Sequence, residues 1–290
     1  MSGVSFSWQN SLRDFAVTVI LWAYYIMGFI LFFSPFYLLV LLFPTRREEA
    51  FQRLNHRLHR SFFALLRALA PRAEWRIGDA VKDIRSSVII ANHVSFLDPI
   101  LFVSLFEKQK TIVKSDYFRL PVFGWILRTS GYIPSPAESL FAADMVDQIK
   151  KMREYLAAGG NLFVFPEGHR SRDGRIGSFD QGAFKIARLC RAASLKVVLI
   201  RNTDRLFPPG RFLFNTSGEI VVDVELAGSL NPDYESESFS LPALMAEVRS
   251  MLERRASSAA SRGAEKVGLD MDENNDYKPP VNGSSEYLLR

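Results

Sequence analysis

The chain has 290 residues, of which 48% are hydrophobic, so it has enough apolar material for one large domain or two small ones and is not disordered overall. Its one cysteine, Cys190, excludes an intramolecular disulfide and a thiolate zinc cluster, and this usage is typical of a reducing compartment. The formal net charge of +5 favours an anionic partner, either a lipid surface or a phosphorylated small molecule. Nucleic acid also carries phosphate, and charge alone does not decide between them.

Residues 15–43 form an aromatic-rich run without a charged side chain, which predicts a membrane anchor. The run is too long for the apolar region of a cleaved signal peptide, and no small-residue cleavage site follows it. Pro35 divides the run, which leaves open one kinked spanning helix or two shorter helices in a re-entrant or interfacial hairpin. A buried core helix is the alternative.

Residues 46–70 carry apolar side chains at helical spacing and arginines elsewhere around the helix. This pattern predicts a basic amphipathic helix at an anionic surface, or a solvated face on an ordinary packed helix. Five arginines lie within 46–60, whereas Arg13 alone precedes the apolar run. If that run spans a membrane, the positive-inside bias places the rest of the chain on the cytoplasmic side.

From residue 87 onward, short β-branched runs alternate with longer helical segments, which predicts an α/β fold with a mostly parallel central sheet flanked by helices. The expected strands are 87–91, 111–114, 161–165, 196–200 and 220–226. The expected helices are 98–108, 117–129, 138–158, 180–193 and 239–256. Three regions follow: an anchoring region at 1–70, a catalytic-type domain at 71–256, and a tail at 257–290 whose polar composition predicts disorder.

His93 and Asp98 lie just past the first expected strand, where open α/β sheets build their sites. An imidazole that acts as a base must be held in one tautomer, and a carboxylate that accepts from its other nitrogen does this. Alternatively, Asp98 caps the following helix and His93 satisfies a turn. These two residues alone leave both interpretations open.

The stretch "FVFPEGHRSRDG" at 163–174 follows another expected strand. Arg170 and Arg172 offer bidentate hydrogen bonds that suit phosphate, and Gly168 allows close backbone approach. Glu167 is suited to orienting an Arg or a His. A solvated turn with surface ion pairs is the alternative.

A third stretch, 114–136, contains a strongly apolar segment at 117–127 that is interrupted by Pro121 and Gly124. It predicts the lining of an acyl-chain groove or a membrane-facing surface, and an ordinary core helix is the alternative.

Four blocks in this order, "NHVSFLDP", "KSDYFRLPVFGWILRTSGYIP", "FPEGHRSRDG" and "VVLIRNTDRLFPPGR", resemble the glycerolipid acyltransferase family typified by 1-acylglycerol-3-phosphate acyltransferase. The resemblance covers about residues 88–210. It places the family's HxxxxD on His93 and Asp98. The other matched positions are Lys114, Phe118, Pro121, Gly124, Gly131, Phe165, Pro166, Glu167, Gly168, Arg170, Ser171, Thr203, Pro208, Pro209 and Gly210.

The resemblance implies a membrane-bound acyltransferase that moves an acyl chain from a thioester to a lysophospholipid hydroxyl, with 1-acylglycerol-3-phosphate as the best candidate acceptor. His93 and Asp98 would be catalytic, and the residues expected to bind substrate are Lys114, Gly131, Glu167, Gly168, Arg170 and Ser171. The implied partners are the lysophospholipid, acyl-CoA or acyl-acyl carrier protein as co-substrate, and membrane lipid. No cofactor, metal or nucleic acid is implied. A membrane-anchored lipid hydrolase and a non-catalytic lipid-binding protein are the competing hypotheses.

One position departs from the family pattern. Members that act on glycerol phosphate usually carry an Arg soon after the Gly of the second block, where this chain has Ala137. The acceptor is therefore either lysophosphatidic acid, held by Arg170, Arg172 or Arg175 instead, or another lysolipid with a zwitterionic or amino-acid head group.

Overall fold

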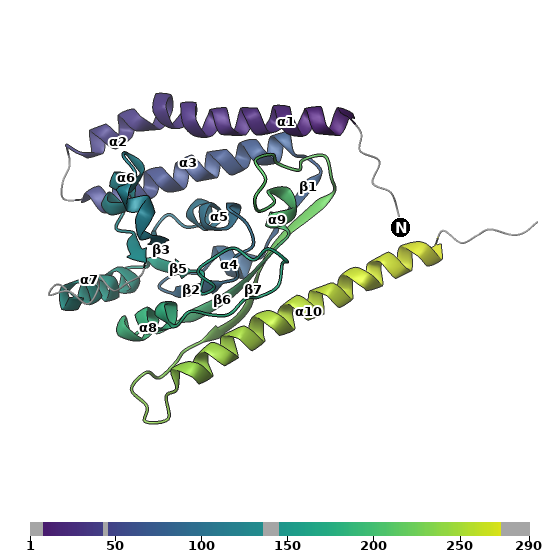
Figure 1. Cartoon of the computed structure of the whole chain (residues 1–290). Helices are drawn as coiled ribbons and strands as arrows, with labels where there is room; N and C mark the ends of the chain where they lie inside the picture. The colour runs from purple at the N-terminus through teal and green to yellow at the C-terminus, as the bar shows by residue number, and fades with distance from the viewer. Residues whose placement is uncertain (1–7, 43–45, 136–144, 274–290) are drawn as a thin grey trace, which may run out of the picture.

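A computed structural model describes residues 8–42, 46–135 and 145–273 of the chain. Within these residues seven strands form one sheet in the order β1-β7-β6-β2-β5-β3-β4, with helices on both faces (Figure 1). The strands are β1 (Ala73–Ile77), β2 (Val88–Ala91), β3 (Gln109–Lys114), β4 (Ile133–Ser135), β5 (Asn161–Val164), β6 (Leu195–Arg201) and β7 (Ile220–Leu230). All neighbouring pairs of this sheet are parallel except β6 and β7. The predicted fold class is confirmed.

Strands β2 and β5 lie at the centre of the sheet, and every residue in both is buried. Because successive side chains of a strand point to opposite faces, the four residues of β2 supply two separate cores. Ile89 and Ala91 belong to one core, and Val88 and Ile90 belong to the other. This burial explains why the central strands read as continuous apolar runs.

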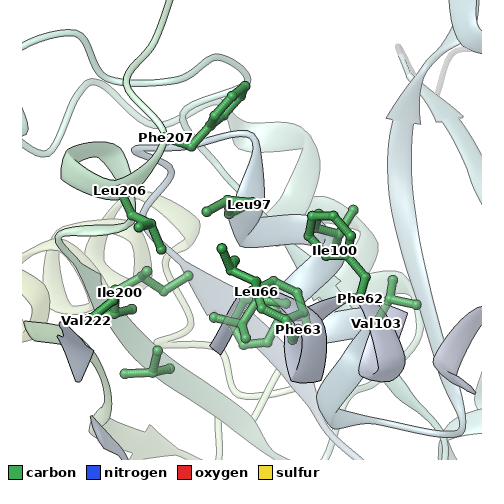
Figure 2. Close-up of a cluster of buried hydrophobic side chains, with 14 of the residues drawn as sticks. Phe62, Phe63, Leu66, Leu97, Ile100, Val103, Ile200, Leu206, Phe207 and Val222 are labelled. Carbon is green, nitrogen blue, oxygen red and sulfur yellow. The ribbon is translucent and has the colours of Figure 1, made fainter. Parts of the chain in front are cut away.

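The first core lies between the sheet and helices α3 (Arg47–Leu69) and α5 (Leu97–Leu105). Figure 2 shows its centre, where side chains of α3 meet those of α5, β6 and β7. The side chains labelled there are Phe62, Phe63, Leu66, Leu97, Ile100, Val103, Ile200, Leu206, Phe207 and Val222. The apolar stripe predicted for 46–70 is therefore packed against the domain, and Arg57 and Arg60 on the same helix are exposed.

The second core is covered by α7 (Met145–Ala157), α8 (Gln181–Leu189) and α10 (Leu241–Glu273). The structure differs here from the disordered tail expected at 257–290, because α10 continues to Glu273. Residues 257–273 contain Ala, Arg, Glu and Lys without proline, and these residues propagate a helix that packing has already started. Residues 274–290 lie outside the described part of the chain.

The N-terminal apolar run is helical as far as Val40, through α1 (Trp8–Ala23), the π-helix η1 (Tyr24–Phe33) and α2 (Ser34–Val40). Pro35 does not divide the run, because it lies in the first turn of α2, where a missing backbone N–H is tolerated. The hairpin is instead formed by this long helix and α3 (Figure 1). Within the described residues, Ser11–Val40 is the one helix long and apolar enough to cross a membrane.

Two tyrosines of η1 fasten the long helix to α3. The Tyr24 hydroxyl donates to Ser61 Oγ over 2.6 Å, and the Tyr25 hydroxyl lies 3.3 Å from His59 Nε2. The opposite side of the long helix is exposed although it is apolar. Its exposed side chains include Phe15, Val19, Ile20, Ile26, Met27, Ile30, Leu31, Phe32, Phe36, Leu38 and Leu39.

The helix expected at 117–129 is divided into the 3₁₀ helix η3 (Ser115–Arg119) and α6 (Phe123–Thr129). Between them the Phe123 N–H donates to the Pro121 carbonyl over 2.6 Å, and Val122 has a φ of 62°, so the chain makes a tight γ-turn. Two further short helices, α4 (Asp79–Lys82) and α9 (Thr203–Leu206), and the edge strands β1 and β4 complete the described fold. These four elements are too short to give a periodic signal.

Candidate active site

The carboxyl ends of three neighbouring strands, β6, β2 and β5, converge at one edge of the sheet. Asn92 follows β2 and joins it to β6: its Nδ2 donates to the Ile200 carbonyl over 2.8 Å, and its Oδ1 accepts from the Ile200 N–H over 2.7 Å. This side-chain bridge continues the ladder for one step, and the chain then turns away from the sheet with His93. A buried strand and a side-chain bridge thus fix where the imidazole emerges.

Asp98 is fully buried in the first turn of α5 and accepts hydrogen bonds on both oxygens. Its Oδ2 accepts from His93 Nδ1 over 2.9 Å, from the Val94 N–H over 2.7 Å and from the Ser95 N–H over 2.8 Å. Its Oδ1 accepts from the Thr203 hydroxyl over 2.6 Å. The catalytic and capping interpretations therefore hold together, since one carboxylate binds both the loop amides and the imidazole.

The His93 ring has a defined tautomer. Because the Asp98 carboxylate oxygen accepts, Nδ1 carries the proton, and the lone pair lies on Nε2. The ring stacks on Phe165, with centroids 4.5 Å apart and an interplanar angle of 26°. The His93 side chain is 16% exposed, whereas that of Asp98 is 0% exposed, so the imidazole borders solvent and its carboxylate partner does not. This is the geometry of an oriented general base.

Glu167, which was expected to bind substrate or to orient a neighbour, is buried behind residues 92–98, called here the catalytic loop because they carry the candidate base His93. Its Oε1 accepts from the His93 N–H over 2.9 Å, and its Oε2 accepts from the Gly177 N–H over 2.8 Å. Glu167 therefore holds the backbone of His93 and ties the loop after β5 to the loop after β2. Of the two roles expected from sequence, orienting a His is the one these contacts support.

The remaining residues of the loop after β5 lie further out. Gly168 has a φ of 67°, a conformation that glycine adopts without strain, and Arg170 is exposed. The Ser171 N–H donates to the His93 carbonyl over 2.7 Å, so this loop also holds the catalytic loop from its outer side. Arg172 and Arg175 are exposed as well.

Lys114 and Gly131 belong to a different part of the sheet. Lys114 ends β3 and is exposed, and Gly131 turns from α6 into β4 with a φ of 71°. A Cβ at Gly131 would lie 2.6 Å from the carboxyl carbon of Glu48, a flexible side chain of α3, so the positive φ is the stronger reason for glycine there. Within the described residues, no hydrogen bond, ion pair or ring contact joins either residue to His93. Ala137 lies outside the described residues.

Two contributors to the site could not be assigned a role from the sequence. Thr203 was a matched position of the family pattern without an assigned role. It is fully buried in α9, and its hydroxyl donates a hydrogen bond to Asp98. Phe165 supports the imidazole face. Both residues lie just after a strand, and this position is the feature of the sequence that could have marked them as part of the site.

Ser95 and Cys190 are the side chains near or within this fold that could act as covalent nucleophiles instead of a direct transfer assisted by His93, and neither is available. The Ser95 hydroxyl is fully buried and donates to the Phe207 carbonyl over 3.0 Å. Burial raises the pKa of the Cys190 thiol to about 11, so it is not a thiolate at neutral pH. Within the described residues no group of three or more His, Cys, Asp or Glu side chains could hold a metal ion.

Comparison with known proteins relates this geometry to a family. Residues 74–200 match the family model described as Acyltransferase. The chain is 37% identical over 124 residues to a chloroplastic 1-acyl-sn-glycerol-3-phosphate acyltransferase of Arabidopsis thaliana, which covers 43% of this chain and 34% of that protein. It is 31% identical over 140 residues to a 1-acyl-sn-glycerol-3-phosphate acyltransferase of Borreliella burgdorferi, covering 47% and 54% of the two chains. These alignments thus span between a third and about half of each relative.

A solved structure supports the same fold. The crystal structure of the 1-acyl-sn-glycerophosphate acyltransferase of Thermotoga maritima aligns with a TM-score of 0.62 at 21% sequence identity, and the alignment covers 85% of this chain and 97% of that one. Residues 74–200, which match the family model, contain the His93 and Asp98 pair and the loop that carries Glu167. Residues 74–200 are therefore similar to the Acyltransferase family, and the chain resembles 1-acyl-sn-glycerol-3-phosphate acyltransferases over less than half of its length.

Proposed function

We propose that this protein is a membrane-bound acyltransferase that transfers an acyl chain from a thioester donor to the hydroxyl of 1-acylglycerol-3-phosphate. The hydrogen bond between His93 Nδ1 and Asp98 Oδ2 is the observation that carries the proposal, because it leaves Nε2 as a base at the solvent border. The similarity to 1-acyl-sn-glycerol-3-phosphate acyltransferases supports the choice of acceptor.

In this mechanism, His93 Nε2 takes the proton of the acceptor hydroxyl as its oxygen attacks the thioester carbon. Asp98 stabilises the imidazolium that forms and keeps the ring in place. The new ester C–O bond forms, the C–S bond breaks, and the proton on His93 passes to the departing thiolate. No acyl-enzyme is required, which agrees with the burial of Ser95 and Cys190.

The acceptor phosphate requires cations near His93. Arg170, Arg172 and Arg175 are exposed on the loop whose Ser171 N–H bonds the His93 carbonyl. Guanidinium groups bind phosphate oxygens bidentately, so this loop is the proposed head-group site in place of the family's Arg at the position of Ala137. A zwitterionic or amino-acid lysolipid is the alternative acceptor.

The proposed membrane attachment uses the exposed apolar side of the helix over 11–40. The opposite side of this helix is fastened to α3 along its length, from Val17 to Tyr37. An element held flat against the domain fits a hairpin that lies within one leaflet better than a helix that crosses the bilayer. The exposed Arg57 and Arg60 of α3 favour the cytoplasmic leaflet, whose surface is anionic.

The test is to purify the full chain in detergent and supply a labelled acyl thioester with a panel of lysolipids, phosphate-bearing and zwitterionic. Transfer to 1-acylglycerol-3-phosphate is expected, with at least a hundredfold loss in His93→Ala and in Asp98→Asn. Lys82→Ala is the control, because Lys82 is an exposed residue of α4, which takes no part in the proposed site. Near-normal transfer by His93→Ala would rule out the mechanism, and release of free fatty acid without an acceptor would identify a hydrolase.

A further inference from the structure

Helix α1 presents three non-aliphatic side chains, Asp14, Thr18 and Trp22, at intervals of four residues. Residues at this spacing lie on one side of a helix. That side faces the segment 207–217, called here the Pro-Pro-Gly loop, which follows α9 and contains Pro208, Pro209 and Gly210. An anchor alone needs no such polar stripe.

Asp14 and Thr18 hold the backbone of this loop. Asp14 Oδ1 accepts from the Thr216 N–H over 2.8 Å, from the Thr216 hydroxyl over 2.7 Å and from the Ser217 hydroxyl over 3.0 Å. The Thr18 hydroxyl accepts from the Phe214 N–H over 2.9 Å and donates to the Asp14 carbonyl over 2.6 Å. Thr18 is 0% exposed, so these bonds are made in a dry contact, where leaving a donor unpaired is costly.

Trp22 extends the contact to the catalytic loop itself. Its ring stacks on Phe212 with centroids 5.8 Å apart, and it lies 6.2 Å from the Phe207 ring and 6.4 Å from the Phe96 ring. Phe96 lies between His93 and Asp98 in the sequence. One helix therefore contacts both the Pro-Pro-Gly loop and the loop that carries the base.

Hydrogen bonds connect the Pro-Pro-Gly loop to Asp98. The Phe207 carbonyl accepts from Ser95 Oγ over 3.0 Å, and the Ser95 N–H donates to Asp98 Oδ2 over 2.8 Å. On the other side, the Asn215 N–H donates to the Leu206 carbonyl at the end of α9, the helix that carries Thr203. A shift of the Pro-Pro-Gly loop would therefore displace Asp98 through its hydrogen bonds with both Ser95 and Thr203.

We propose that Asp14, Thr18 and Trp22 are positioning residues for acyl transfer, so that α1 is a structural part of the active site as well as an anchor. Their contacts fix the Pro-Pro-Gly loop and, through it, the Ser95, Phe96 and Asp98 side of the catalytic loop. The kinetic consequence rests on the proposed function, whereas the structural coupling does not.

The test uses paired substitutions in the full chain in detergent. Thr18→Val keeps the side-chain shape but removes the acceptor, and Thr18→Ser keeps the acceptor. Asp14→Ala removes its acceptor, and Asp14→Asn retains an Oδ1 oxygen. Ile20→Ala, at an exposed position of the same helix, is the control.

In Thr18→Val and Asp14→Ala, kcat is expected to fall about tenfold, and the KM of each substrate is expected to stay within twofold. Amide hydrogen exchange is expected to rise about tenfold in 207–217 and in 92–98. Thr18→Ser, Asp14→Asn and Ile20→Ala are expected to stay within threefold of the wild type in both measurements.

Vesicle flotation of the Asp14 and Thr18 variants separates positioning from anchoring, and each of these four is expected to float like the wild type. Unchanged exchange in 92–98 for both Thr18→Val and Asp14→Ala would overturn the coupling, and raised exchange with an unaltered kcat would overturn the positioning role. If the wild type acylates no lysolipid, the proposed function fails, and the exchange measurement still decides whether α1 is coupled to the catalytic loop.

Discussion

The Thr203 hydroxyl donates a 2.6 Å hydrogen bond to Asp98 Oδ1 from a position 105 residues further along the chain. Both groups are fully buried, so the bond fixes the carboxylate whose other oxygen holds His93. Thr203→Val is expected to lower kcat about tenfold, because a net hydrogen bond to a charged group is worth roughly 1.5–3 kcal/mol and part of this is lost in the transition state. Thr203→Ser keeps the hydroxyl and should stay within threefold. Steady-state kinetics of Thr203→Val and Thr203→Ser tests whether Thr203 fixes the Asp98 carboxylate, and equal kcat values in the two variants would contradict this role.

Glu167→Gln is expected to be costly although it preserves shape. The backbone N–H groups of His93 and Gly177 each need an acceptor, and the amide nitrogen of Gln cannot accept. One buried N–H is left unpaired, at a cost of roughly 1–3 kcal/mol, so both the free energy of unfolding and kcat should fall. Urea unfolding and initial rates measure the two effects. If Glu167 bound the head group instead, the KM for the lysolipid would rise while the unfolding midpoint stayed constant.

His59 predicts a pH dependence of stability. Burial lowers its pKa from 6.5 to about 4, and its Nδ1 lies 2.7 Å from the Asn55 carbonyl, so the folded state keeps the neutral ring with a proton on Nδ1. The unfolded chain binds a proton at higher pH than the folded chain does, so stability is lost as pH falls from 6.5 toward 4. Between pH 7 and pH 5 this loss is about 2 kcal/mol.

The pH effect is measured by urea unfolding of the wild type and of His59→Gln at pH 7 and pH 5. His59→Gln should remove most of the difference between the two pH values. His169→Gln is the control, because His169 is exposed. The same pH dependence in the wild type and His59→Gln would show that other groups cause it.

Ile26, Ile30 and Leu31 test the membrane-facing side of η1. They are 55%, 51% and 58% exposed, and replacing all three with Ser removes apolar surface available to lipid. At about 1 kcal/mol for each half-exposed side chain, vesicle binding should weaken roughly a hundredfold. Val146→Ser, at a 78% exposed position on α7, is expected to bind vesicles like the wild type. Flotation with anionic vesicles gives the comparison.

Gly124→Ala is expected to destabilise the turn before α6. A Cβ at this position would lie 2.1 Å from the Phe118 carbonyl oxygen, so the backbone must shift, at a cost of about 1–3 kcal/mol. Gly78→Ala provides the comparison, because its Cβ would meet the Val224 carbonyl at an ordinary 3.6 Å. Unfolding midpoints of the two variants should differ, with Gly78→Ala close to the wild type.

The sequence was most informative where a residue's role depends on its neighbours in the chain. The strand expected at 87–91 follows from local pattern and is present as β2, and the pairing of His93 with Asp98, one of the two interpretations that the local pattern left open, is present as well. The contacts of Thr203 and Glu167 depend on which strands become neighbours, and local hydrophobic periodicity does not predict strand order. For the same reason, the hydrogen bonds of Asp14 with Thr216 and Ser217 could not be predicted from an apolar helix.

The parallel pairing of β1 with β7 has a consequence for biosynthesis. Arg72, just before β1, donates to the carbonyl of Ser217, which is 145 residues later, and β1 has its described ladder partner only in β7. At roughly 5–20 residues per second, a ribosome needs roughly 7 to 30 s to make the intervening chain. During that interval the emerging N-terminal hairpin exposes the apolar side of α3, which later covers the sheet. Early contact of this hairpin with a bilayer would shelter that side while the rest of the chain is translated.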